Sequence, residues 1–122
     1  MHTRRHDGAP IGNDGHEAAG IIAELGEGVT NWRVGQRVGA SAVAGCGQCA
    51  YCQKGQNTWC DNFKVFVQMH AEYFLASALA CHALPDDVPW DVGVLITGDG
   101  MGVPYHTSRK IKDDTATVAI FG

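Results

Sequence analysis

Four cysteines in one short segment constrain this chain more than any other feature of its sequence. They are spaced C-x2-C-x2-C-x7-C, at Cys46, Cys49, Cys52 and Cys60. Three thiolates at intervals of three residues, with a fourth one short loop away, can converge on a single tetrahedral metal ion. The glycines around them permit the tight turns that such an arrangement needs. The spacing therefore predicts a closed four-thiolate zinc site over 45–61, structural because no coordination position is left open.

Two other uses of four cysteines compete with a zinc site. Two disulfides would suit an exported protein, but the first residues are basic and no apolar stretch of a secretory signal follows them. A ferredoxin-type iron–sulfur cluster also begins C-x2-C-x2-C, but its fourth cysteine follows after three residues and precedes proline. Here seven residues intervene and Asp61 follows Cys60. We therefore expect one structural zinc ion per chain.

Composition narrows the class of protein. The chain has 122 residues, 45% of them hydrophobic and 18% charged, which fits one globular domain with a modest core. Its net charge of −4 argues against a nucleic-acid partner. No apolar run approaches the length of a membrane span, so no membrane partner is expected. Free thiols without an export signal favour the cytoplasm.

The first two-thirds of the chain has strand character. Apolar residues between glycine-rich turns predict a strand at 18–25, and 35–43 is expected to form a turn that enters a strand running through Val43. The segment 71–81 begins with a strand-like Tyr and Phe and continues into an ambiguous alanine-rich piece. These features predict a mainly β protein.

The last third is expected to contain helices and one final strand. A loop at 85–90 leads into a helix from about Trp90, in which 92–96 is apolar enough to be buried. A second helix is expected over 102–110, with Pro104 tolerated only in its first turn. Ala116–Phe121 is a continuous apolar run, the pattern of a buried parallel strand.

Several motifs together resemble the zinc-dependent medium-chain alcohol dehydrogenases. The family is built from a GroES-like catalytic domain of β-strands and a Rossmann nucleotide-binding domain. The resemblance implies a mainly β fold with a few short helices, a GroES-like partial β-barrel with a zinc lobe. It rests on the cysteine segment and, in order, on Gly15-His16-Glu17-Ala18-Ala19-Gly20, Gly26-Glu27-Gly28-Val29, Val34-Gly35-Gln36-Arg37-Val38, Ala71-Glu72-Tyr73 and Leu84-Pro85.

The same resemblance implies a domain truncated at both ends. We expect 1–115 to be a truncated GroES-like domain that includes the zinc lobe at 45–61, and 116–122 to be the remnant of the first Rossmann strand. The rest of the Rossmann domain is then absent, and with it the glycine loop that binds the dinucleotide. NAD(P) is a cofactor of the family, but this chain is not expected to bind it.

The family likeness also implies a remnant of a catalytic zinc site. His16 resembles the family's histidine ligand, Glu17 its neighbouring carboxylate and Asp99 the third ligand, which is usually cysteine. The family's first cysteine ligand has no counterpart here, so a second zinc would bind weakly. His2 is a candidate proton-relay residue. The glycines of 98–102 mimic a dinucleotide fingerprint but lack its third glycine, and Cys81 is interpreted as a small buried hydrophobe.

Two functions from different classes follow. The first is part of an alcohol dehydrogenase, an oxidoreductase that transfers hydride between a small alcohol or carbonyl substrate and NAD(P), inactive with NAD(P) on its own. The second is a stand-alone oligomeric zinc-binding scaffold without dehydrogenase activity. In both, sheet edges left unpaired by the missing strands predict a homo-oligomer, with a dimer favoured.

Overall fold

The computed structural model describes residues 15–111 and 117–121, and its centre is a small antiparallel sheet. The sheet has the order β1-β2-β5, formed by β1 (Glu17–Ile21), β2 (Arg37–Ser41) and β5 (Cys81–Ala83). Gly39 at its middle pairs with Ala19 on one side and His82 on the other. Small residues along β1 and β2 leave the sheet surface low enough for a helix to approach it closely.

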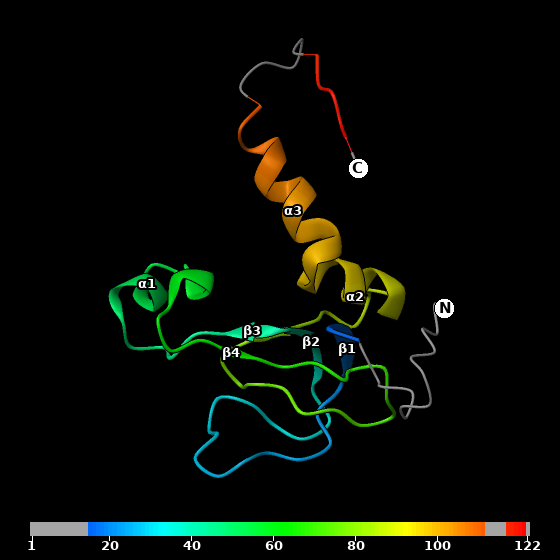
Figure 1. The fold of residues 1–122 in the computed structure, drawn as a ribbon. Coiled ribbons are helices and arrows are strands. Elements are labelled where there is room, and N and C mark those ends of the chain that lie inside the picture. Colours follow the sequence, from blue (N-terminus) through cyan, green and yellow to red (C-terminus); the bar gives the residue numbers. More distant parts are fainter. Residues whose placement is uncertain (1–14, 112–116, 122) are drawn as a thin grey trace, which may run out of the picture.

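A second, two-stranded sheet carries the cysteine segment. It pairs β3 (Val43–Ala44) with β4 (Lys64–Val65). Between these strands lie the short helix α1 (Ala50–Gln53) and the 3-10 helix η1 (Asn57–Trp59). The segment between β3 and β4 therefore forms a lobe that stands apart from the other helices (Figure 1).

Two consecutive helices follow the sheets. The first, α2 (Trp90–Thr97), lies on the three-stranded sheet, and α3 (Asp99–Ser108) rises away from it (Figure 1). Two glycines make the α2 contact possible. A Cβ on Gly39 would lie 2.6 Å from the Thr97 Cβ, and one on Gly93 would lie 2.7 Å from the Leu84 Cδ1, both closer than real Cβ atoms come.

The hydrophobic core is small and lies under β1 and β2. Ala18, Ala40 and Met69 are its buried members, with Phe66 and Phe74 packed against them. Because two of its three buried members are alanines, the core offers little apolar burial, and other contacts contribute to holding the domain together.

The predicted fold class is confirmed: over the described residues the protein is mainly β, with three short α-helices and two open sheets. Across residues 15–111 and 117–121 the strands form no closed barrel. None of the helices in these ranges is long and apolar enough to cross a membrane.

The prediction that 92–96 is buried is wrong for most of its residues. Gly93 is buried, but Val92, Leu95 and Ile96 are exposed. The reason is geometric: α2 turns Gly93 and Thr97, one helical turn apart, toward the sheet. Its larger apolar side chains must then lie on the other faces of the helix.

The second helix begins earlier than predicted, at Asp99, so Pro104 lies beyond the first turn. Proline has no N–H to donate to the carbonyl of Gly100, and this helical hydrogen bond is missing. Flanking helical turns, including the bond from the Gly102 N–H to the Gly98 carbonyl, keep the helix continuous.

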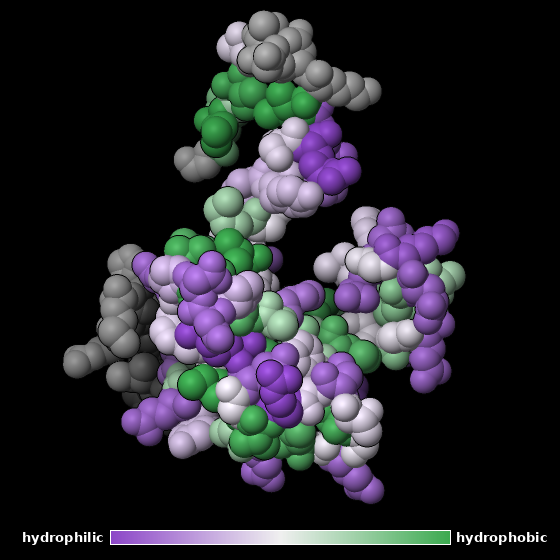
Figure 2. Space-filling model, turned by 180° about the vertical axis from the view of Figure 1, so that it is seen from behind, coloured by the Kyte–Doolittle hydropathy of each residue, from purple (hydrophilic) through white to green (hydrophobic). Residues whose placement is uncertain are grey.

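Two predicted strands are not formed within the described residues, which leave out Ala116, the first residue of the second one. Residues 71–76 have no strand, and their Tyr73 and Leu75 side chains are exposed. Residues 117–121 are also without strand structure, with Ile120 91% and Phe121 93% exposed. They lie beyond the far end of α3, away from both sheets, where hydrophobic side chains gather (Figure 2). A strand needs a neighbour to accept its hydrogen bonds, and the described residues place none beside either segment.

Candidate functional site

The cysteine lobe brings all four predicted metal ligands together. Their sulfur atoms lie within 4.8 Å of one another, with 3.5 Å between Cys49 and Cys52 and 4.0 Å between Cys46 and Cys52. Four sulfurs at about 2.3 Å from one zinc ion stand roughly 3.8 Å apart in a tetrahedron. The observed cluster therefore matches the size of a four-thiolate zinc site, and all four cysteines are free rather than paired as disulfides.

Each of three sulfurs also accepts hydrogen bonds from the backbone. The Gln48 N–H donates to Cys46, the Cys52 N–H donates to Cys49, and the N–H groups of Cys46 and Asn62 donate to Cys60. Such bonds favour the charged thiolate over the thiol. The sequence spacing did not reveal these donors, although the turn-forming glycines near the cysteines were a signal that backbone amides would face the sulfurs.

Ionisation differs among the thiols of the metal-free cluster. The Gln48 N–H is the main reason why the pKa of Cys46 is lowered from 9.0 to about 6. Burial raises the pKa of Cys52 to about 11. One thiolate therefore forms easily, and the pKa of Cys52 stays high unless a cation is present to offset the desolvation of its thiolate. A divalent metal ion supplies that charge.

Glycines shape the lobe in two ways. Gly47 and Gly55 have φ of 77° and 72°, the left-handed conformation that other residues rarely adopt. Gly45 is needed for a close approach: a Cβ there would lie 3.0 Å from the Asn57 Oδ1 and closer still to the Cys52 sulfur. The lobe backbone thus fits closely around its sulfur cluster.

The second predicted group is only partly assembled. His16 Nε2 lies 3.4 Å from the Asp99 Oδ2, although the two residues are far apart in sequence. Both side chains are exposed, at 51% and 81%. Glu17 is not part of this pair, and its Oε1 accepts a hydrogen bond of 2.6 Å from the Gly100 N–H.

Across the described part of the chain, the cysteine cluster is the one group of three or more potential ligands that converge. A second metal ion would therefore meet two groups, His16 and Asp99. The remaining candidate, His2, lies outside the described residues. Cys81 is partly buried against the core and burial raises its thiol pKa, as expected for a packing residue.

The Gly98–Gly102 segment, which mimics a dinucleotide fingerprint, starts α3 instead. A Cβ on Gly98 would lie 2.7 Å from the Glu17 Cδ. Gly98 and Gly100 therefore make room for a carboxylate from β1. The sequence contained this signal, but without the fold it could not be connected to Glu17.

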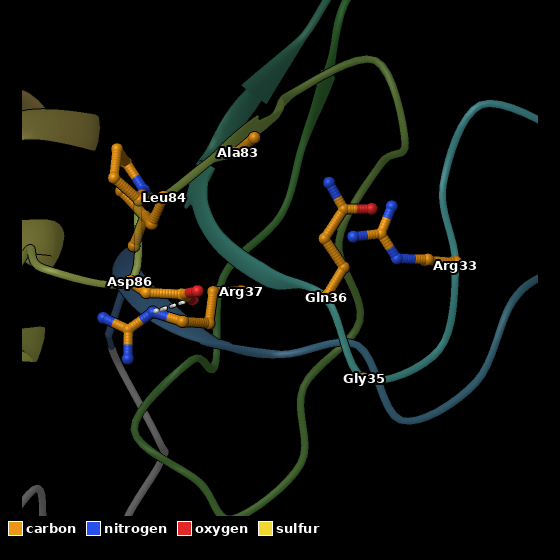
Figure 3. Close-up of a pocket in the computed structure, with 8 residues that line it drawn as sticks. Arg33, Gly35, Gln36, Arg37, Ala83, Leu84 and Asp86 are labelled. Atoms are coloured by element: carbon orange, nitrogen blue, oxygen red, sulfur yellow. Dashed lines mark ion pairs between the residues drawn. The ribbon is translucent and has the colours of Figure 1, made fainter.

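A hollow of about 400 Å³ lies beside the start of β2, and three of its lining residues, Arg33, Arg37 and Asp86, are charged. Figure 3 shows the Arg37 guanidinium directed toward Asp86, across the hollow from Arg33 and Gln36. Arg37 also stacks on the Trp90 ring at 3.6 Å and donates to the Val88 carbonyl. The charged groups do not converge on one point, and Arg37 instead joins β2 to the start of α2.

Comparisons with known proteins agree with this geometry. Residues 3–86 match the family described as the alcohol dehydrogenase GroES-like domain. An L-threonine 3-dehydrogenase from Deinococcus deserti is 36% identical over 98 residues, which cover 77% of this chain and 28% of the relative. An alcohol dehydrogenase from Geobacillus stearothermophilus is 40% identical over 82 residues, covering 63% of this chain and 24% of that protein.

Solved structures give the same result. The apo form of zinc-dependent alcohol dehydrogenase 2 from Streptococcus pneumonia superposes with a TM-score of 0.57 at 33% identity. The match covers 67% of this chain and 25% of that structure. The chain thus spans about a quarter of the length of the proteins that it matches.

Proposed function

We propose that the chain forms the zinc-carrying catalytic part of an oxidoreductase, because it belongs to the family of alcohol dehydrogenases with a GroES-like domain. The reaction would transfer hydride between a small alcohol or carbonyl substrate and NAD(P). The observation that carries this proposal is the pairing of His16 with Asp99 at 3.4 Å, because it brings together two motifs that are far apart in the sequence.

The four cysteines would hold one structural zinc ion. Four thiolate bonds replace the hydrophobic core that so small a lobe lacks, and structural zinc contributes folding free energy directly. The backbone N–H groups of Gln48, Cys52 and Asn62 donate hydrogen bonds to these sulfurs and favour the thiolate form that binds the metal.

His16 and Asp99 would hold a second, weaker zinc ion. When bound, such an ion acts as a Lewis acid that lowers the pKa of an alcohol. The exposure of both side chains leaves them accessible to a substrate from solvent. With two ligands rather than three, we expect its affinity to be far below that of the cysteine site.

The dinucleotide would be bound by residues outside these 122. Pyrophosphate binding in this class needs a glycine loop between a parallel strand and a helix, and the described residues contain only antiparallel strand pairs. The 122-residue chain alone should therefore show no NADH binding by fluorescence titration and no alcohol oxidation.

A fusion experiment separates the proposal from its alternative. The chain joined to the nucleotide-binding domain of the Geobacillus stearothermophilus relative should produce NADH from an alcohol, and His16→Ala should abolish this production. A folded fusion that binds NADH and retains its cysteine-bound zinc, yet oxidises none of a panel of primary, secondary and amino alcohols, would favour the stand-alone zinc scaffold. The zinc-scaffold alternative is supported by one observation: among the described residues, the cysteine cluster is the single group of three or more potential metal ligands that converge.

Assembly and location complete the proposal. We infer a homodimer, because apolar side chains of α2, α3 and 117–121 are exposed. Light scattering at micromolar concentration tests this, and a monomer would contradict it. Five free thiols favour the reducing cytoplasm. We expect neither a nucleic-acid nor a membrane partner.

A further inference from the structure

Glu17 makes a contact that its sequence position did not suggest. It belongs to β1, yet its Oε1 accepts a 2.6 Å hydrogen bond from the backbone N–H of Gly100, in the first turn of α3. A distance this short is typical of a bond to a charged acceptor. The bond therefore ties the sheet to the start of the helix.

The sequence around Gly100 is shaped to receive this carboxylate. A side chain at position 98 would collide with Glu17, and one at position 100 would lie 3.4 Å from its Oε1 and 3.1 Å from the Leu95 Cδ2. Neither glycine has a positive φ that would otherwise require it. Close approach of Glu17 is thus a reason for both glycines.

The helix also needs the carboxylate. Gly98 occupies the N-cap position of α3 and has no side chain to accept a first-turn N–H. The free N–H groups at a helix start carry a partial positive charge, so a carboxylate there is favourable. Glu17 supplies from another element the cap that α3 lacks.

The position of Asp99 follows from this cap. Asp99 lies between Gly98 and Gly100, and His16 directly precedes Glu17. The Glu17–Gly100 bond and the His16–Asp99 pair therefore join the same two segments at neighbouring residues. Loss of the first contact would free the first turn of α3 and with it the Asp99 carboxylate.

We propose that Glu17 is a positioning residue, which anchors the first turn of α3 and so holds Asp99 beside His16, rather than a ligand of the metal. This inference rests on the proposed second zinc site for its functional consequence. The anchoring itself involves no metal and can be measured separately.

The test compares Glu17→Gln, which keeps a side-chain oxygen acceptor, with Glu17→Ala, which removes it. Two quantities are measured on protein whose cysteine site is already loaded with zinc: hydrogen exchange of the Gly100 amide by NMR, and affinity for a further zinc ion by calorimetry. We expect Glu17→Ala to speed Gly100 exchange and to weaken the second zinc about tenfold, whereas Glu17→Gln keeps most of both. Retention of the first zinc serves as the control for folding.

Two results would overturn the proposal. One is unchanged Gly100 exchange in Glu17→Ala. The other is a Glu17→Gln protein that keeps Gly100 protection but loses the second zinc as fully as Glu17→Ala, because this is the behaviour of a metal ligand. If the unsubstituted protein binds no second zinc, the proposed second metal site fails, and amide exchange alone decides whether Glu17 anchors α3.

Discussion

Substitution of Gly45 by alanine tests whether the lobe is built around the geometry of its sulfur cluster. The new Cβ would lie at least half an ångström closer to the Cys52 sulfur than real Cβ atoms come and would also press on the Asn57 side chain. Metal sites tolerate ligand shifts of about 0.2 Å, so the thiolate must leave its position or the backbone must move.

The expected loss of zinc affinity follows from the contribution of one ligand to the binding free energy. Structural zinc binds with roughly 10–16 kcal/mol, so losing one ligand of four forfeits about 3 kcal/mol. We therefore expect zinc affinity to fall about 100-fold. Competition with a colorimetric zinc chelator measures this loss.

Gly26→Ala is the matched control for this substitution. A Cβ added at Gly26 would meet no atom within 4 Å, and Gly26 has no positive φ, so its replacement should leave zinc affinity unchanged. A Gly45→Ala protein with an affinity within twofold of the original would refute the argument that the lobe backbone fits tightly around the sulfurs.

Three further predictions concern thiol chemistry and stability. In the metal-free protein at pH 7, iodoacetamide should alkylate Cys46 much faster than Cys52, because Cys46 is mostly thiolate above its pKa of about 6 while the pKa of Cys52 is about 11. Peptide mass spectrometry measures both alkylation rates, and equal rates would contradict this difference in pKa. The rate at Cys46 should fall as the pH drops below about 6, since protonation removes the nucleophile. Arg37→Met should lower the free energy of unfolding by about 1–3 kcal/mol, because the stacking on Trp90 and the hydrogen bond to the Val88 carbonyl are lost. Urea denaturation measures this change, and unchanged stability would show that the Arg37 contacts do not stabilise the fold.

The cysteine lobe could be predicted from sequence because its information is local. Spacing alone places Cys46, Cys49 and Cys52 on one short turn and Cys60 within reach, and the structure brings all four sulfurs together. The start of α2 at Trp90 was also predicted, because the loop at 85–90 leads directly into it.

The predictions that failed concern tertiary contacts, which depend on which surfaces of the helices and strands pack together. The apolar side chains of α2 looked buried, but Gly93 and Gly39 decide where the helix touches the sheet. The apolar segment 117–121 has strand composition without a strand neighbour among the described residues. His16 and Asp99 were connected by family resemblance alone, and the Glu17–Gly100 bond required the fold itself.

The central claim is that Cys46, Cys49, Cys52 and Cys60 hold one zinc ion. X-ray absorption spectroscopy at the zinc edge, together with elemental analysis of the purified protein, tests it most directly. We predict about one zinc per chain surrounded by four sulfur atoms at about 2.3 Å. Iron in place of zinc, a shell containing nitrogen or oxygen, or metal-free protein with disulfides among these four cysteines would contradict the claim.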